Sequence, residues 1–558
     1  MTLRSASFVP FVALLSSVAF ACADDGAGDD EIGDSSGTSD SGTSDSGTSD
    51  TNTSDTDTSD TGTSDTGGVP CEEDPDQATI HTTYGPVTGG ASDVEGVRRF
   101  SNIPYAEPPI GLLRFAAPEP PTPWQEPRDA TEFGPRCIQL AVSGDDPSTV
   151  GSEDCLQLNV WTPDACEGAD HPVMVFIHGG GNAVGSAVDP LYDGAILAGA
   201  QEAVVVTLNY RLGALGWFAA TEHGIPGNNG LRDQILALEW VRDNIDRFGG
   251  DPDRVMIFGE SAGAVNTCAL VGAPAAAGLF SAAIVQSGTC RQQPFADLEA
   301  MSQELKVSLG CTGDEAPACL LSVAAEDLVF AAPNGYPSVA GLGQGWGPCV
   351  DGELLPKTTL EALSAGEVDV PFVVGSNRDE TFQDTPPNLT AADYQTLVTI
   401  SFGFLANQVL AAYPVDDYPT PSAAWASLTT DLKFVCSARK AAVASAQGGA
   451  PTWRYQFSFD DYTTLPNTPR YAFHGLELVY LFGNFSAIFG GGFDYQPNAG
   501  ELELSLAMQQ AWSEVAAGAG FPGPSYEIGV DPYRDIDVPN GEGAGLRTAQ
   551  CDFWDQWL

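Results

Sequence analysis

The fold is decided by Val255-Met-Ile-Phe-Gly-Glu-Ser-Ala-Gly-Ala264. The first four residues are apolar and predict a short buried strand, and the small residues at the end begin a predicted helix. Between them, Gly259, Ser261 and Gly263 have the Gly-x-Ser-x-Gly spacing of a nucleophile elbow, a tight turn in which glycines keep Cβ atoms out of a crowded space. The turn places the serine at the positive end of the helix, where an oxyanion is favoured. We therefore expect a nucleophilic serine at position 261.

Apolar strands and helices alternate on both sides of this turn. We expect strands over Val173–Ile177, Ala203–Leu208, Val255–Phe258, Ala282–Gln286, Pro371–Gly375 and Trp453–Phe459, and helices over Asn229–Phe248 and Ala262–Leu270. Strands that alternate with helices indicate a mainly parallel central sheet covered by helices on both faces. The predicted fold class is α/β.

The first 75 residues differ in composition from the rest of the chain. Residues 1–21 have the basic start, apolar run and small-x-small cleavage site of a signal peptide. Residues 22–75 form a low-complexity acidic tether, in which a pentad ending in Thr-Ser-Asp repeats six times. From residue 76 the composition is that of a globular protein, so we expect one catalytic domain over residues 76–558.

Cys22 follows the predicted cleavage site directly. The sequence is compatible with a lipid anchor on Cys22 and with ordinary signal cleavage, and both readings predict export. The protein is then either lipid-anchored to the cell envelope or secreted. After the signal peptide, we expect no run that reaches the roughly 20 apolar residues that a membrane span needs.

The charge balance excludes one class of partner. The chain has 22 Lys and Arg against 75 Asp and Glu, a net charge of −53. So acidic a protein is repelled by polynucleotides, and we expect no nucleic-acid partner. Twelve cysteines in an exported chain predict a disulfide framework. They lack the clustering of a zinc site, so we expect no metal.

A serine nucleophile needs a base, usually a histidine held by a carboxylate, and in this fold the three follow the order serine, acid, histidine. Of five histidines only His474 follows Ser261, so elimination assigns the base. Asp379 and Glu380 come just after the predicted strand Pro371–Gly375, at the sheet edge where α/β proteins gather their ligands. Position favours Asp379 and Glu380 over Asp460 and Asp461, which follow the next predicted strand. It does not show which of Asp379 and Glu380 is the acid.

The oxyanion hole requires backbone N–H donors near the serine. A glycine triplet, Gly179 to Gly181, directly follows the predicted strand Val173–Ile177. The N–H groups of Gly180, Gly181 and Ala262 fit the pattern, and each such donor is worth about 2.7–4 kcal/mol of transition-state stabilisation. A glycine triplet alone is often only a turn, but its place upstream of the elbow favours the functional interpretation.

Eight motifs add to the triad and the elbow. They are Phe100-Ser-Asn-Ile-Pro-Tyr-Ala106, Ser152-Glu-Asp-Cys-Leu156, His178–Gly181, Asn209-Tyr-Arg-Leu-Gly213, Pro226–Gly263, Val350-Asp-Gly-Glu353, Gly375-Ser-Asn-Arg-Asp-Glu380 and Phe473-His-Gly-Leu-Glu477. Through them, residues 78–558 resemble the type-B carboxylesterases, the family of the α/β-hydrolase fold that includes the cholinesterases. The resemblance implies a serine carboxylesterase that acts on a small-molecule ester without a cofactor.

The resemblance also separates the two acids, because the family's acid is the glutamate that corresponds to Glu380. One departure is Thr381, where the family usually has glycine. Glu260 and Ser287 resemble positions of a buried polar network behind the serine. In the implied mechanism His474 takes the proton of Ser261, and water later hydrolyses the acyl-enzyme.

The family pairs the cysteines that match Cys137 with Cys155, Cys311 with Cys319, and Cys436 with Cys551. Cys268 and Cys290 follow adjacent elements and are candidates for a fourth bridge, whereas no pairing can be argued for Cys71, Cys166 and Cys349.

Two alternatives accompany this interpretation. A lipase or thioesterase of the same fold is the nearer one. A non-catalytic adhesion protein is the other, since relatives that lost the serine serve adhesion, but all three triad positions are filled here. Selectivity for choline esters is not expected, because residues 138–154, the loop where cholinesterases hold the quaternary ammonium on a tryptophan, contain no aromatic residue.

Overall fold

The computed structural model describes residues 79–141, 148–163, 168–332, 339, 341–342, 345–462, 470–490 and 495–557. The predicted signal peptide and tether lie outside the described residues, as do Cys22, Cys71 and Cys166. The chain divides after Gly67, and every described residue belongs to the second unit, Gly68–Leu558.

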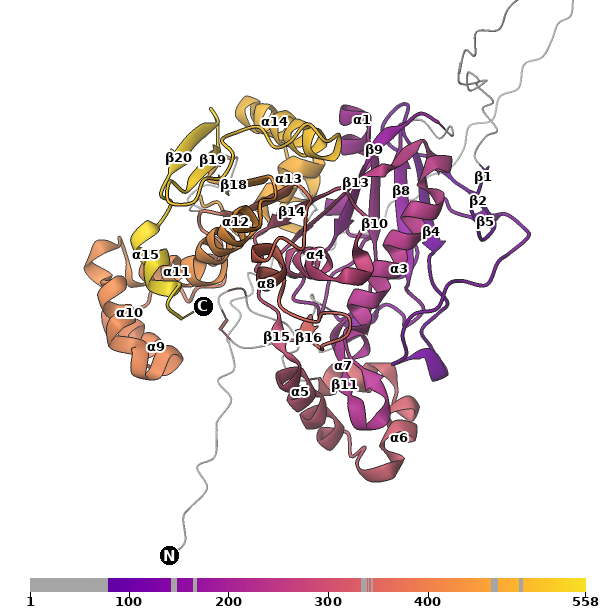
Figure 1. Cartoon of the computed structure of the whole chain (residues 1–558), viewed down its shortest axis with the longest axis horizontal. Helices are drawn as coiled ribbons and strands as arrows, with labels where there is room; N and C mark the ends of the chain where they lie inside the picture. Colours follow the sequence, from indigo (N-terminus) through magenta and orange to yellow (C-terminus); the bar gives the residue numbers. More distant parts are fainter. Residues whose placement is uncertain are drawn as a thin grey trace, which may run out of the picture. The chain divides into compact units, whose positions relative to one another are not determined.

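A sheet of eleven strands forms the centre of this unit (Figure 1). In spatial order its strands are β20 (Gly541–Ala544), β19 (Pro532–Ile536), β18 (Thr452–Phe457), β17 (Phe372–Asn377), β14 (Ala282–Gln286), β13 (Gly250–Glu260), β9 (His171–Ile177), β10 (Val204–Leu208), β8 (Gln157–Thr162), β4 (Arg98–Pro104) and β3 (Gly90–Ala91). Neighbouring strands are parallel from β19 to β10 and antiparallel at both ends of the sheet. The prediction of a mainly parallel α/β sheet is confirmed.

Strand β9 shows how the sheet separates two apolar cores. Its side chains point to alternate faces, as the period of two in a strand requires. Val173, Val175 and Ile177 belong to one buried cluster, and Met174 and Phe176 belong to the other. Because both faces are covered, the central strands are apolar throughout rather than alternating.

Helices from different parts of the chain cover the two faces (Figure 1). The first core includes residues of α3 (Asn229–Asn244), α4 (Ala262–Gly272), α5 (Phe295–Ser308), α8 (Thr359–Ser364) and α12 (Cys436–Gly448). The second includes residues of α1 (Ala195–Gln201), α13 (Leu476–Phe482) and α14 (Ala499–Ala516). The expected helices after the second and third strands are thus α3 and α4, although the last turn of the predicted first helix is a separate 3₁₀ turn, Ile245–Phe248.

The remaining elements lie around this sandwich. The helices are α2 (Gly213–Trp217), α6 (Ala316–Ser322), α7 (Ala325–Ala331), α9 (Ala391–Phe402), α10 (Ala406–Ala412), α11 (Pro421–Thr430), the π-helix Asp431–Val435 and α15 (Thr548–Trp554). The short strands are β1 (Thr79–His81), β2 (Pro86–Thr88), β5 (Arg128–Asp129), β6 (Gln139–Leu140), β7 (Thr149–Val150), β11 (Ala219–Ala220), β12 (Ile225–Pro226), β15 (Gln293–Pro294) and β16 (Cys349–Val350).

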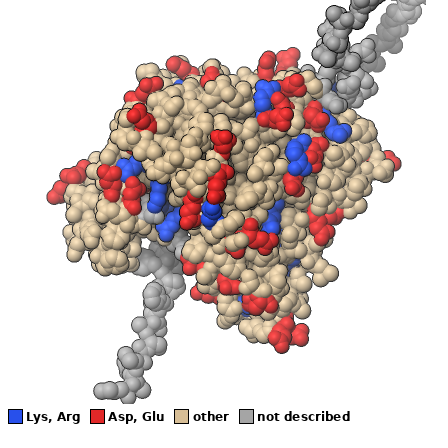
Figure 2. Space-filling view, viewed as in Figure 1, with Lys and Arg blue, Asp and Glu red and all other residues tan. Residues whose placement is uncertain are grey.

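The run Ala391–Ala412 corrects one expectation. By length and composition it is apolar enough to cross a membrane, and only 17% of its most apolar window is buried. Its two helices, α9 and α10, are separated at Gly403. This residue has a φ of 52°, which glycine adopts at little cost. Asp393 is its single charged residue, and in Figure 2 the surface over these helices is largely tan, whereas red and blue side chains are scattered over much of the rest of this face.

Four disulfides join described residues. They link Cys137 with Cys155, Cys268 with Cys290, Cys311 with Cys319, and Cys436 with Cys551. Cys349 has a free, buried thiol, and burial raises its pKa to about 12. Disulfides of this kind are typical of proteins that mature in an oxidising compartment, which is consistent with export.

Candidate active site

Ser261 lies between β13 and α4 in a backbone conformation that an ordinary residue seldom adopts, with φ 58° and ψ −122°. The neighbouring glycines make this turn sterically feasible. A Cβ at Gly259 would lie 2.5 Å from the carbonyl oxygen of Gly263, and a Cβ at Gly263 would lie 2.0 Å from that of Ile177. The Ser261 N–H donates to the carbonyl of Gln286 at 3.0 Å, which fixes the turn against β14. The geometry is that of a nucleophile elbow.

Glu380 and His474 meet at the carboxyl end of β17. Nδ1 of the imidazole lies 2.5 Å from Oε2 of Glu380, and the carboxylate is buried. Its other oxygen accepts a hydrogen bond from the N–H of Asn377 at 2.7 Å. The His474 N–H donates to the Glu380 carbonyl at 3.2 Å, so both backbone and side chain fix the ring.

Asp379, the other member of the pair that position left open, faces elsewhere. Its carboxylate accepts from the N–H of Ala472 at 3.1 Å and pairs with Arg378 at 2.9 Å. The structure therefore brings Glu380, and not Asp379, to the imidazole.

The far side of the imidazole faces a second carboxylate. Nε2 of His474 lies 3.1 Å from Oε1 of Glu260, but neither atom has a hydrogen-bond partner among the described residues. A Cβ at Gly179 would lie 2.9 Å from Oε2 of Glu260 and 3.0 Å from Cβ of Ser261, so the serine and this carboxylate border the same glycine. The Ser261–His474 hydrogen bond is not formed in this arrangement; such bonds often tighten only with substrate.

A third buried carboxylate, Glu477, was not predicted as a site residue. Its oxygens accept from Asn377 Nδ2 at 2.5 Å and from Gln286 Nε2 at 3.3 Å. One signal was present in the sequence, because Glu477 lies three residues after His474 and closes the last motif. Ser287, the other candidate behind the serine, is buried with φ 53°, and its hydroxyl has no hydrogen-bond partner within the described part of the chain.

The three carboxylates control the charge of the histidine. Burial raises the pKa of Glu260 to about 8 and that of Glu477 to about 7. Burial alone would lower the pKa of His474, but the negative charges of Glu260 and Glu380 outweigh it and raise this pKa to about 9. Within the described residues, no arginine or lysine pairs with any of the three carboxylates.

The glycine triplet forms a tight loop after β9. Gly180 and Gly181 have φ of 106° and 62°, and a Cβ at Gly180 would lie 2.2 Å from the carbonyl oxygen of Val184. His178 at the start of the loop is buried and stacks on Tyr210 at 4.5 Å between ring centroids. Burial lowers the pKa of His178 to about 4, so this ring is neutral and serves packing.

Comparison with known proteins identifies the family. A profile of the carboxylesterase family matches residues 76–554. This chain belongs to the carboxylesterase family. It is a serine carboxylic-ester hydrolase with the α/β-hydrolase fold, as the resemblance in its motifs implied.

The relatives of this carboxylesterase cover most of its length. The para-nitrobenzyl esterase of Bacillus subtilis (strain 168) is 39% identical over 454 residues, which cover 78% of this chain and 89% of the relative. The fumonisin B1 esterase of Sphingopyxis macrogoltabida is 35% identical over 508 residues, or 87% and 91% of the two chains. The solved structure of a thermophilic PNB esterase superposes with a TM-score of 0.74 at 34% identity and covers 85% of this chain and 99% of its own.

In this carboxylesterase Thr381 stands where the family usually has glycine, and the structure shows what its side chain does. Its hydroxyl lies 2.9 Å from the carbonyl oxygen of Ala426 and 2.6 Å from the hydroxyl of Thr429, both on α11. The loop that carries Glu380 is thereby attached to α11. The π-helix that continues α11 places Phe434 against His474, at 5.1 Å between ring centroids.

A small apolar cavity adjoins the glycine loop of this carboxylesterase. Its lining includes Ile138, Ala183, Leu215 and Trp346. Ser261, Glu380 and His474 are not among its lining residues. In the described part of the chain, no group of three or more His, Cys, Asp or Glu residues has the arrangement of a metal site.

Proposed function

We propose that this protein is an extracytoplasmic carboxylesterase that hydrolyses small-molecule esters through a Ser261–His474–Glu380 triad and an acyl-enzyme. The observation that carries the proposal is the 2.5 Å contact between the His474 imidazole and the buried Glu380 carboxylate, beside a serine on a nucleophile elbow. A carboxylate on Nδ1 holds the tautomer in which Nε2 is free to accept a proton.

The reaction has two halves. Nε2 of His474 takes the hydroxyl proton as Ser261 Oγ attacks the ester carbonyl carbon, and the carbonyl oxygen becomes an oxyanion. The N–H groups of Gly180, Gly181 and Ala262 stabilise that charge. The intermediate collapses, and the leaving alcohol takes the proton from His474. Water then attacks the acyl-enzyme by the same route, and the acid product leaves Ser261 free.

Glu260 supports the histidine in this scheme. Glu260 and His474 face each other at 3.1 Å; burial raises the pKa of Glu260, whereas the negative charges of Glu260 and Glu380 raise the pKa of His474. Catalysis starts when the imidazole is neutral, because Nε2 must be free to accept the Ser261 proton. The imidazolium that forms during attack is then stabilised by Glu380.

We propose export on the basis of the first 75 residues and the four disulfides. In this proposal residues 1–21 are removed, Cys22 carries a lipid, and residues 22–75 hold the catalytic domain away from the envelope. Mass spectrometry of the mature N-terminus tests the anchor. An acyl mass on Cys22 supports it, whereas an unmodified Cys22 α-amino group means free secretion.

The activity is tested with nitrophenyl esters of graded acyl length and one thioester, each compared with the Ser261→Ala variant. We expect the wild-type protein to hydrolyse the oxygen esters and the variant to be inactive. Equal rates for the wild-type protein and the variant would exclude the serine mechanism. A strong preference for the thioester would instead favour a thioesterase.

A further inference from the structure

The proposed oxyanion hole is assembled from two separate pieces of chain. Gly180 and Gly181 belong to the loop after β9, whereas Ala262 is the first residue of α4, about 80 positions later. Donors that stabilise an oxyanion must keep fixed positions of about 2.7–3.1 Å from the developing charge. Some interaction must therefore hold the loop against the helix.

A hydrogen bond between two buried asparagines joins these two pieces. Nδ2 of Asn266 donates to Oδ1 of Asn182 at 2.8 Å, and the residues are 0% and 3% exposed. Asn182 directly follows Gly181 and has φ 56°. Asn266 is four residues after Ala262 in α4, so the two lie on the same face of the helix, one turn apart.

Asn182 is fixed on its other sides as well. Its carbonyl accepts from the N–H of Gly213 at 2.6 Å, and its Nδ2 donates to the carbonyl of Trp346 at 3.3 Å. The start of the loop is held by Tyr210, whose hydroxyl donates to the carbonyl of His178 at 2.8 Å. These bonds tie the loop to Gly213, Trp346 and Tyr210, and the Asn182–Asn266 bond ties it to α4.

We propose that Asn182 and Asn266 are positioning residues that fix the loop donors of the oxyanion hole relative to the helix donor. The inference rests on the proposed function, because an oxyanion forms only if Ser261 attacks an ester. Neither side chain is required to touch the substrate. A loop that shifts by about 1 Å loses catalysis by up to about 100-fold, although the substrate still binds.

The experiment compares Asn266→Ala, Asn182→Gly and the double variant with the wild-type protein. Glycine is used at position 182 because it adopts φ 56° without strain. Asn229→Ala is the matched control, since Asn229 is also buried and its Nδ2 donates to the carbonyl of Phe115 at 2.8 Å. Asn266→Ser, which keeps a donor on a smaller side chain, replaces Asn266→Ala if that variant does not fold.

We expect each single substitution to lower kcat about tenfold, with KM within about twofold. The double variant should lose no more than Asn182→Gly alone, because that substitution already removes the Asn182–Asn266 bond together with the bond to Trp346. Binding of a trifluoromethyl ketone, whose adduct with Ser261 carries an oxyanion, should weaken by the same factor as kcat. The control Asn229→Ala should lower thermal stability and leave kcat unchanged.

Unchanged kcat, a rise in KM alone, or unchanged ketone binding in folded variants would overturn the proposal. Hydrogen exchange separates this result from failure of the proposed function. The amides of Gly180 and Gly181 should exchange faster in Asn266→Ala than in the control, whether or not the protein hydrolyses an ester. A wild-type protein without esterase activity refutes the function, whereas unchanged exchange of these amides refutes the positioning role.

Discussion

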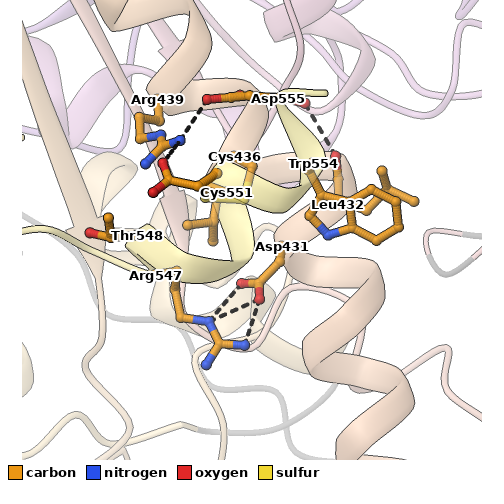
Figure 3. The surroundings of a disulfide bond; sticks show 12 residues. Asp431, Leu432, Cys436, Arg439, Arg547, Thr548, Cys551, Trp554 and Asp555 are labelled. Carbon is orange, nitrogen blue, oxygen red and sulfur yellow. Dashed lines mark hydrogen bonds and ion pairs between the residues drawn. A yellow bond between two sulfur atoms is a disulfide. The ribbon is translucent and has the colours of Figure 1, made fainter. Parts of the chain in front are cut away.

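Two clusters of charged residues meet at the π-helix Asp431–Val435, and they are built in opposite ways. In the first, which we call the C-terminal clamp, Asp431 accepts three hydrogen bonds from Nε and Nη2 of Arg547 at 2.5–3.0 Å (Figure 3). The disulfide Cys436–Cys551 joins α12, which directly follows the π-helix, to α15, which begins directly after Arg547. Arg439 adds further ion pairs to two aspartates of the C-terminal segment (Figure 3).

The second cluster surrounds His474, the proposed catalytic base. Glu260, Glu380 and Glu477 are at most 5% exposed, and the cation that faces them is His474, which can lose its charge. Phe434 of the π-helix packs on that imidazole, while Asp431 at the other end of the π-helix belongs to the clamp. The π-helix therefore lies between the permanent ion pairs of the clamp and the titratable groups around His474.

The difference shows what each arrangement is for. A permanent guanidinium fixes the charge of its partner at every physiological pH, which suits a group whose role is to hold two helices together. A base must gain and lose a proton during each turnover, so a permanent cation beside it would favour the wrong state. Buried carboxylates without a permanent cationic partner lower the stability of the folded protein. Their negative charge nevertheless keeps the pKa of the imidazole high.

The largest effect is expected at the catalytic cluster. Ser261→Ala, His474→Ala and Glu380→Gln should each lower kcat by roughly 10⁴-fold or more while the protein stays folded. Their combinations should lose little further activity, because the three act as one unit. Steady-state kinetics and circular dichroism check both parts. An active Glu380→Gln protein together with an inactive Asp379→Asn protein would reverse the assignment of the acid.

The clamp should respond in the opposite sense. Arg547→Leu leaves the buried Asp431 carboxylate without its guanidinium, and we expect a loss of about 3 kcal/mol in the free energy of unfolding. The value is taken at the low end of the usual range because the Arg547 side chain is 30% exposed. The kcat of the protein that remains folded should change less than about twofold.

Urea unfolding measures this difference. The control is Arg242→Leu, which breaks an exposed pair with Asp243 and should cost less than about 1 kcal/mol. If Arg547→Leu abolished kcat without unfolding the protein, the clamp would be part of the catalytic machinery and the contrast between the two clusters would fail.

A smaller effect concerns pH. His474 must be neutral to accept the serine proton, so kcat/KM rises as the pH increases through the pKa of His474. The negative charge of Glu260 raises that pKa, and Glu260→Gln removes the charge. The rising limb of the profile should therefore move to lower pH, by about one unit. The matched control is Glu501→Gln, a fully buried carboxyl that accepts from the hydroxyl of Tyr480 and should leave the profile unchanged. A shift to higher pH would contradict the proposed electrostatics.

Much of this arrangement is visible in the sequence, and the reason is local. The elbow requires glycines on both sides of Ser261, so the spacing of these glycines in the sequence indicates the backbone geometry. His474 follows from chain order alone, since no other histidine comes after the serine. The parallel strands follow from apolar runs that are buried on both faces.

What the sequence does not show depends on contacts between distant residues. Asp379 and Glu380 are adjacent, and only the turn after β17 directs one to Ala472 and the other to His474. The Asn182–Asn266 bond joins positions 84 residues apart, and no periodicity marks it. The run Ala391–Ala412 was missed for a different reason: its apolar residues are interrupted by Gly403 and by small polar residues.

The smallest effect is expected for a cationic substrate. A choline ester carries a permanent positive charge, which the catalytic cluster lacks. Selectivity for this ester would mean that the cluster binds a permanent cation, as the clamp does. The structure argues against such selectivity. The three carboxylates are buried, and Glu153, an acidic residue of the loop between Cys137 and Cys155, is already paired with Arg114 at 2.6 Å. That loop also has no aromatic ring for a cation.

We therefore expect a choline ester and its uncharged 3,3-dimethylbutyl isostere to differ by less than tenfold in kcat/KM at about 0.15 M salt, a difference below about 1.4 kcal/mol. At low ionic strength the net charge of −53 should accelerate the arrival of any cation and imitate selectivity, so the ratio must be followed as salt is raised. A ratio that falls toward one reports steering by the whole surface. A preference above tenfold that persists at high salt would mean that the catalytic carboxylates, or another acidic group, contact the substrate cation. The catalytic cluster would then bind a permanent cation, and the difference between the two clusters would no longer hold.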